Sequence, residues 1–194
     1  MKNNRPIQLP SIEELEAEIY RQKHRQTQHH LLRNALYALI TVAAVTALIA
    51  ILFMPVLKTY GTSMTPTLEE GEIVVAIKTS TASQGDVIAF YYNNKIFIKR
   101  VIALGGAEVD IDEEGFVYVD GERLDEPYVT ERAIGNGDVE FPFQVPDGQY
   151  FVLGDNRMAS ADSRSTTLGC VEPDDMLGRV LFCIWPLNRL HVIH

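Results

Sequence analysis

A single uncharged apolar run constrains this chain more than any other feature. No charged residue lies between Arg33 and Lys58, and residues 35–57 read ALYALITVAAVTALIAILFMPVL. As a helix, these 23 residues would be roughly 35 Å long, enough to cross a bilayer core of about 30 Å. A cleaved export signal would be shorter and would end in a small-x-small site, whereas the large residues Phe53 and Met54 lie near the end of this run. The sequence therefore predicts a permanent transmembrane helix.

The charges on the two sides of this run predict its orientation. Residues 1–34 carry six Lys/Arg and four Glu, a net charge of +2, whereas residues 58–194 carry 11 Lys/Arg and 22 Asp/Glu, a net charge of −11. Because cationic residues that flank a span stay in the cytoplasm, we expect a cytoplasmic tail (1–34), a membrane span (35–57) and an extracytoplasmic domain (58–194). Nucleic acid is excluded as a partner, since binding it requires a basic face.

The tail contains a second periodic segment. Ile12, Leu15 and Ile19 recur at helical spacing, which predicts a short helix over 12–32 that either ends before the span or runs on into it. Such a helix would bind a partner or the membrane surface, or it would be a solvated lead-in to the span.

From Tyr60 onward the pattern changes to short runs of Val, Ile, Tyr and Phe that are separated by turn signals. Asp120-Gly121, for example, predicts a tight hairpin with a primed turn. Frequent short strands with such turns are typical of a mainly β, antiparallel domain. The expected strands are Ile73–Ile77, Val87–Tyr92, Lys95–Ala103, Glu108–Ile111, Phe116–Val119, Gln149–Leu153 and Gly178–Trp185.

The cysteines and histidines indicate no metal centre. Cys170 and Cys183 lie in the part expected outside the cell, where a disulfide is chemically permitted, and the sequence leaves open whether they are bonded or are two buried thiols. The five histidines have no metal-ligand spacing, so we expect neither a metal nor another cofactor.

Two residues after the span have the types needed for nucleophilic catalysis. Ser63 lies in a Gly-Thr-Ser-Met-Thr-Pro segment, where a serine alone is most often a turn residue. Lys99 alternates with Phe97 and Val101, which predicts that the three share one face of a strand. An apolar face lowers the pKa of a lysine, and a fall of about three units from ~10.4 would let the amine act as a base near neutral pH. The alternative is an amphipathic lysine with its amine in water.

A third segment, residues 154–165, reads GDNRMASADSRS and contains no large aliphatic residue except Met158. It is therefore not a core strand. Either it is a solvated loop, or it supplies hydrogen-bonding groups that hold a catalytic base in position.

Together these segments resemble the bacterial type I signal peptidases, the leader peptidase family of Ser/Lys proteases, in its small single-anchor form. That family has a Ser-Met-x-Pro-Thr segment beyond its anchor, then a Gly-Asp strand, a Lys-Arg strand and a Gly-Asp-Asn segment that ends in Ser-x-Asp-Ser-Arg. All four occur here in order, beginning at Ser63, Gly85, Lys99 and Gly154. The resemblance covers about Tyr60 to Trp185.

The resemblance implies a β-sheet domain of the signal-peptidase and SOS-repressor type, and an endopeptidase that removes signal peptides from exported preproteins after small residues in an A-x-A-like pattern. It makes Ser63 the nucleophile and Lys99 the general base. Its other implied roles are a serine that orients the lysine (Ser160), a structural ion pair (Asp162 and Arg164), a second pair of this kind (Arg100 and Asp155) and pocket-lining residues (Met64 and Ile98).

The resemblance also implies a bacterial cell membrane as the location, with signal peptides and the lipid bilayer as partners. One departure concerns Gly61: some members have a serine there that donates a hydrogen bond to the oxyanion, so the second oxyanion donor stays open. Two other interpretations are a self-cleaving repressor, which would carry a DNA-binding domain in place of the span, and a non-catalytic β domain that binds an export partner.

Overall fold

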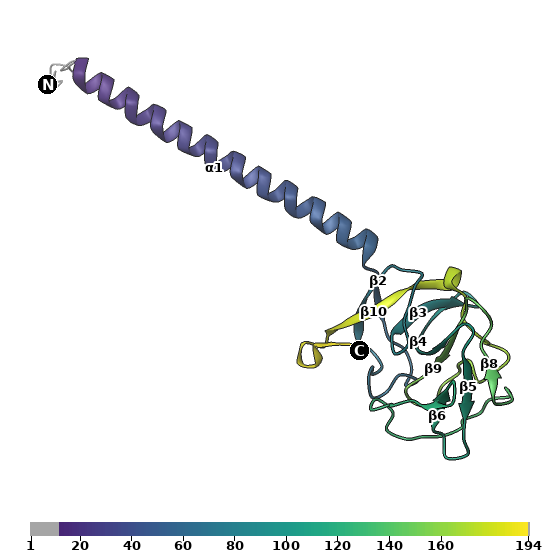
Figure 1. Ribbon diagram of the computed structural model, residues 1–194. Helices are drawn as coiled ribbons and strands as arrows, with labels where there is room; N and C mark the ends of the chain where they lie inside the picture. The colour runs from purple at the N-terminus through teal and green to yellow at the C-terminus, as the bar shows by residue number, and fades with distance from the viewer. Residues whose placement is uncertain (1–11, 194) are drawn as a thin grey trace. The chain divides into compact units, whose positions relative to one another are not determined.

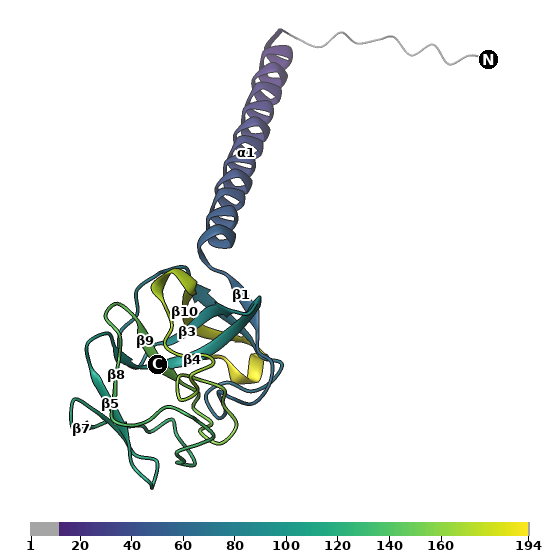
Figure 2. The same ribbon diagram turned by 90° about the vertical axis from the view of Figure 1, so that its right-hand side faces the viewer.

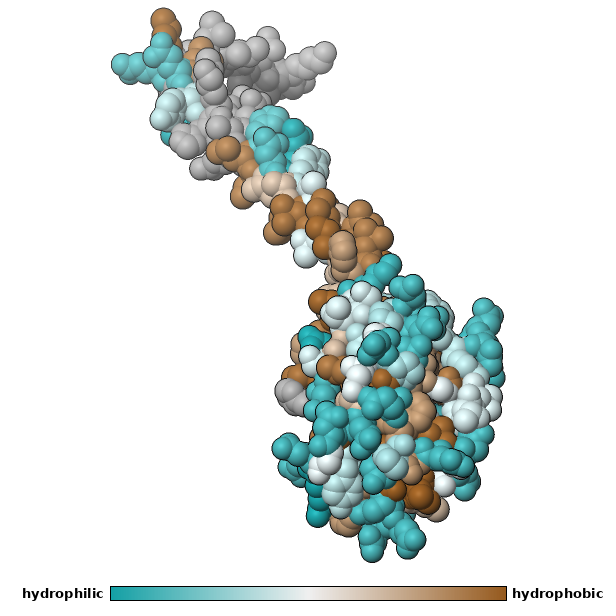
Figure 3. All heavy atoms as spheres, turned by 45° about the vertical axis from the view of Figure 1, so that its right-hand side comes forward, coloured by the Kyte–Doolittle hydropathy of each residue, from teal (hydrophilic) through white to brown (hydrophobic). Residues whose placement is uncertain are grey.

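The computed structural model describes residues 12–193, and the chain divides into two compact units between Ala50 and Ile51. The described residues of the first unit, 12–50, lie in one unbroken helix, α1 (Ile12–Phe53), so the helix of the tail runs on into the apolar segment (Figure 1). Its part His30–Phe53 has a mean hydropathy of 2.6, and none of it is buried against other residues. Figure 3 shows apolar side chains covering this part of the helix. By length and composition it is able to cross a membrane.

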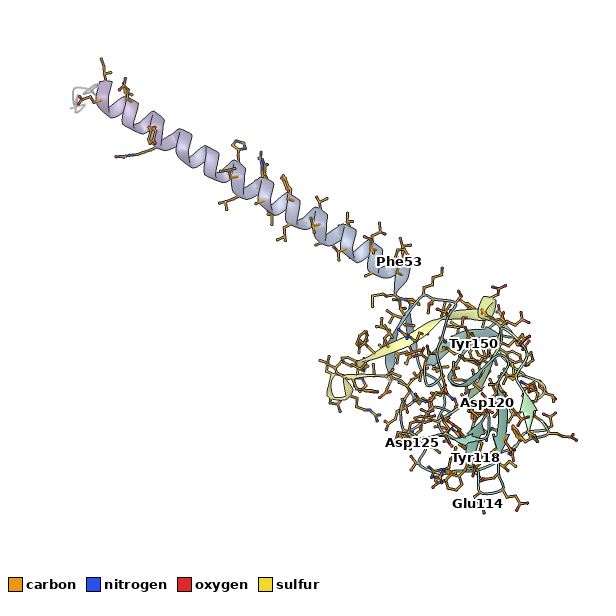
Figure 4. The ribbon with its side chains drawn as sticks, in the orientation of Figure 1. Phe53, Glu114, Tyr118, Asp120, Asp125 and Tyr150 are labelled. Atoms are coloured by element: carbon orange, nitrogen blue, oxygen red, sulfur yellow. The ribbon has the colours of Figure 1, made fainter. Side chains whose placement is uncertain are left out.

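The helix ends earlier than expected. Its last residue is Phe53, which Figure 4 labels at the end of α1, whereas the sequence predicted a span that reaches Leu57. Pro55 has no amide hydrogen to donate, and it disfavours helical geometry in the residue before it. Val56–Lys58 instead forms strand β1, so the expected boundary at Leu57 was wrong.

The second unit consists of two antiparallel sheets (Figures 1 and 2). The larger has the order β1-β2-β10-β3-β4-β9, with β11 paired to β10, and the smaller has the order β7-β6-β5-β8. A mainly β, antiparallel domain is therefore confirmed. The strands after β1 are β2 (Ile73–Ile77), β3 (Val87–Tyr92), β4 (Lys95–Leu104), β5 (Glu108–Ile111), β6 (Val117–Val119), β7 (Glu122–Arg123), β8 (Phe143–Gln144), β9 (Tyr150–Leu153), β10 (Met176–Trp185) and β11 (His191–Val192).

Two tight turns set the registers of the hairpins. Asp120 and Gly121 both have positive φ, as a primed turn requires, and β6 pairs with β7 around them as predicted. Asn93 and Asn94 likewise have positive φ and join β3 to β4. The register that follows places Lys99 opposite Ile88.

The core positions the serine segment on the large sheet. Met64 and Leu68 are 4% and 1% exposed and pack among residues of β2, β3 and β10, such as Val74 and Val87. These two anchors flank the turn that follows Ser63, so burial of apolar area holds this segment against the sheet.

Both cysteines are free thiols in the structure. Burial raises the pKa of the Cys170 thiol to about 11 and also raises the pKa of Cys183. The sequence left open whether Cys170 and Cys183 form a disulfide or are two free thiols, and the structure has free thiols.

Candidate active site

Ser63 and Lys99 meet in the β unit, although they are far apart in the sequence. The Lys99 Nζ lies 2.6 Å from the Ser63 Oγ, which is hydrogen-bond distance. Lys99 is only 2% exposed, and its Nζ lies 5.8 Å from the centre of the Phe97 ring. Phe97 and Val101 pack in one core cluster, as the alternation in the sequence predicted. The alternative in which the Lys99 amine lies in water is therefore wrong.

Burial lowers the pKa of the Lys99 amine from 10.5 to about 8, because a charged amine loses its hydration there. The fall is smaller than the three units expected. The carboxylates of Asp162 and Asp155 favour the charged amine and oppose the effect of burial, whereas the Arg164 guanidinium adds to it. A substantial fraction of the amine is thus neutral slightly above neutral pH, and a neutral amine accepts a proton.

Ser63 lies in a compact turn, Thr62–Leu68, which we call the nucleophile loop. The Leu68 amide donates to the Met64 carbonyl over 2.8 Å. Asn156 braces the loop from the polar segment: its amide donates to the Ser63 carbonyl (3.1 Å), and its side chain donates to the Thr62 carbonyl (3.2 Å). The sequence did not single out Asn156, because nothing local marks a contact between segments so far apart.

Gly154 lets the polar segment approach the nucleophile loop. A Cβ on this glycine would lie 2.4 Å from the Ser63 carbonyl oxygen and 2.2 Å from the Ser160 Oγ, both closer than real atoms come. Only glycine therefore fits at this crossing, where two backbones come close together.

Arg100 and Asp155 form the buried pair that the sequence predicted. The Arg100 guanidinium donates to both Asp155 oxygens, at 2.9 and 2.7 Å, and both side chains are 1% exposed. The Thr67 hydroxyl donates to the same carboxylate over 2.5 Å. Asp155 thus joins the strand of Lys99, through the adjacent Arg100, to the nucleophile loop.

Asp162 and Arg164 form the second predicted pair, with two hydrogen bonds of 2.8 Å. Burial alone would raise the pKa of Asp162, but the hydrogen bonds and charge of Arg164, together with the Gly154 amide, hold it below its ordinary value. A third buried pair, Arg157 with Glu126 at 2.5 Å, was missed. The segment 154–165 is thus a buried network and not a solvated loop.

The expected hydrogen bond from Ser160 to the Lys99 amine is not formed. The buried Ser160 Oγ instead lies near the Asp162 carboxylate, whose pKa it helps to lower, and it points into the space left by the missing side chain of Gly154. A side-chain rotamer of this kind is set by packing across the loop and is not readable from the sequence.

A cavity of about 890 Å³ opens beside the catalytic pair. Met64 and Ile98, both predicted to line pockets, are among its lining residues, with Ala159 and Ala161. It extends along β1 and the first half of β4. In the described part of the chain, β1 is an edge strand, and β9 pairs with β4 only from Arg100 onward. The cavity is therefore lined by backbone with free hydrogen-bonding groups.

In the part of the chain that the structure describes, no three His, Cys, Asp or Glu side chains are grouped so as to hold a metal ion.

A serine hydroxyl bonded to a buried lysine amine, at a cavity on an antiparallel β domain, is the arrangement of a serine hydrolase with a lysine base. The sequence profile of the signal peptidase, peptidase S26, family matches residues 31–185. The chain belongs to this family.

Individual relatives agree with this assignment. The chain is 36% identical over 167 residues to signal peptidase I of Bacillus licheniformis, an alignment that covers 78% of this chain and 88% of the relative. It is 37% identical over 149 residues to signal peptidase IB of Staphylococcus aureus (strain COL), covering 66% and 76%. The crystal structure of a signal peptidase I from Enterococcus faecalis V583 matches with a TM-score of 0.42 and 29% identity, over 51% of this chain and 96% of that chain.

Proposed function

We propose that this chain is a membrane-anchored serine endopeptidase that removes N-terminal signal peptides from exported preproteins after small residues, with Ser63 as nucleophile and Lys99 as general base. The observation that carries the proposal is the 2.6 Å contact between the Ser63 Oγ and the buried Lys99 Nζ. A buried amine of lowered pKa is the group that a serine needs for activation.

In the proposed reaction, the neutral Lys99 amine takes the proton of Ser63 as the Oγ attacks the scissile carbonyl carbon. The resulting ammonium then gives this proton to the leaving amine of the mature protein, which leaves an ester between Ser63 and the signal peptide. Lys99 next takes a proton from water as its oxygen attacks the ester carbon. The ammonium gives this proton to the Ser63 Oγ as the ester bond breaks and the signal peptide is released, so the serine hydroxyl and the neutral amine are both restored.

The Ser63 amide is the first candidate for oxyanion binding. Among residues 12–193 it donates to no backbone carbonyl, so its hydrogen is available to the developing negative charge. Gly61 has no hydroxyl to add a second bond, and a Cβ there would touch nothing within 4 Å. This side of the site is open, so water has room to supply the second bond.

The cavity supports an extended substrate. A peptide that lies between β1 and Lys95–Lys99 would add backbone hydrogen bonds to both strands, and alternate side chains would point into the cavity. Because Met64 and Ile98 occupy part of the lining, small side chains before the cleaved bond fit best.

Membrane association follows from the apolar helix, and we propose in addition that the N-terminus is cytoplasmic and the β unit extracytoplasmic. Ser63 comes ten residues after Phe53, the last helical residue, a reach of at most about 35 Å even for extended chain. The nucleophile is thus tethered near the membrane surface, where the end of a membrane-held signal peptide would be presented.

The test is cleavage in trans. The full chain in detergent is mixed with a purified preprotein that carries an A-x-A signal, and the new N-terminus is determined by mass spectrometry. We expect cleavage directly after the second alanine, with turnover of more than one substrate per enzyme. Binding without cleavage, or cleavage of the enzyme's own chain alone, would contradict the proposal.

A further inference from the structure

The C-terminal hairpin contacts the nucleophile loop at residues other than those that the polar segment contacts through Asn156. This hairpin is formed by β10 and β11, which are joined through a short 3-10 turn, Leu187–Arg189. Arg189 donates from Nη2 to the Pro66 carbonyl over 3.3 Å, and the His191 Nε2 lies 3.2 Å from the Thr67 carbonyl oxygen. Neither Arg189 nor His191 lines the substrate cavity. Their contacts are with the backbone that carries Ser63.

Arg189 is itself anchored by two carboxylates. Its Nε lies 2.8 Å from an oxygen of Glu72, a side chain that is 2% exposed, and its Nη1 pairs with Glu69. The Glu69 amide also donates to Glu72 over 2.9 Å. The guanidinium is therefore fixed in place, and its bond to Pro66 has a rigid support.

His191 has an arrangement that only one protonation state satisfies. Its Nδ1 lies 2.8 Å from the Arg189 carbonyl oxygen, and its Nε2 faces the Thr67 carbonyl oxygen. Carbonyl oxygens only accept hydrogen bonds, and a neutral imidazole has one N–H. Both bonds are made together only by the imidazolium, which has two.

The charged and titratable groups around His191 come from three segments. Arg189 lies on its own hairpin, Glu69 and Glu72 lie before β2, and Cys183 is its register partner on β10.

Thr67 connects this hairpin to the base. Its carbonyl faces His191, and its hydroxyl donates to Asp155, which pairs with Arg100 next to Lys99. The nucleophile loop is thus held between two supports, one of which also fixes the strand of the lysine.

We propose that Arg189 and His191 are positioning residues that hold the nucleophile loop in the reactive geometry, through their contacts with the Pro66 and Thr67 carbonyls. The inference rests on the proposed function.

The test compares full-length variants in detergent on one preprotein. We expect His191→Gln, which keeps at most one of the two donors, to lower kcat about fivefold, the factor that one ordinary hydrogen bond contributes. Arg189→Met should lower it at least as much, and KM should change less than twofold in both variants, since the cavity is untouched. The matched control is Arg179→Met, which removes a half-exposed guanidinium from the same hairpin, where it pairs with Asp86. It should leave kcat within twofold, and thermal midpoints measured for all variants identify any that is unfolded.

The decisive readout is the split between kcat and KM in variants whose thermal midpoint stays close to that of the wild type. In His191→Gln and Arg189→Met, kcat should fall while KM stays within twofold, because these residues hold the loop that carries Ser63 and do not line the cavity. An unchanged kcat in both variants would overturn the inference while leaving the function intact, whereas a wild type that cleaves no preprotein would refute the function itself.

Discussion

Replacing Ser63 or Lys99 by alanine is expected to lower preprotein cleavage by about 10⁴-fold or more, the range seen when one member of a catalytic unit is removed. Ser63→Ala removes the atom that forms the ester. Lys99→Ala removes the amine that lies 2.6 Å from it. Lys99→Arg should be equally inactive, because a guanidinium stays protonated and accepts no proton. The measurement is kcat/KM for one preprotein across the three variants and the wild type.

Two controls make this result specific. Lys78→Ala removes an exposed lysine outside the cavity and should leave kcat/KM unchanged. The double variant Ser63→Ala/Lys99→Ala should be no slower than either single variant, since the two residues act as one unit. Turnover above a hundredth of the wild-type value in Lys99→Ala would mean that another group is the base.

The second large effect is expected on stability. Asp155→Asn keeps the shape of the side chain but removes the carboxylate charge that pairs with the Arg100 guanidinium, which is 1% exposed. Breaking a buried pair in this way costs about 3–5 kcal/mol, which corresponds to a fall in the thermal midpoint of about 10 °C for a chain of this size. Because Asp155 also accepts from Thr67, kcat should fall as well.

The control for this variant is the partly exposed pair of Arg179 and Asp86. Asp86→Asn weakens a pair whose side chains are 41% and 22% exposed, so it should cost no more than about 1 kcal/mol. Replacing both charges, as in Asp155→Asn/Arg100→Met, should recover part of the stability lost in the single variant, because no buried charge is then left unpaired. Equal effects of Asp155→Asn and Asp86→Asn would contradict the role given to burial.

Much of the fold was predictable because its strands are bounded by strong turn signals. Asn93-Asn94 and Asp120-Gly121 mark hairpins in the sequence, and both have the positive φ that these residues tolerate. The strands β1, β8 and β11 were missed, since each is only two or three residues long, too short to show an alternating pattern. The helix end was misjudged because hydropathy continues past Pro55, whereas helical geometry does not.

The sequence predicted which residues form the candidate active site better than it predicted the contacts that hold them. Ser63, Lys99 and the Arg100–Asp155 pair were predicted from the resemblance carried by four segments in a familiar order. The sequence could not reveal which way the Ser160 hydroxyl points, because a rotamer depends on its packing. Arg189 and His191 were missed for a related reason: their contacts with the nucleophile loop are to backbone carbonyls, which carry no sequence signal.

The central claim is that the Lys99 amine is neutral when it acts on Ser63, and the most direct test is the pH dependence of kcat/KM in the full-length enzyme. Burial lowers the pKa of this amine to about 8, so the rate should rise with pH and level off as pH passes about 8. A rate that keeps rising to about pH 10.5, the ordinary value for lysine, or one that is already constant well below pH 8, would contradict the account.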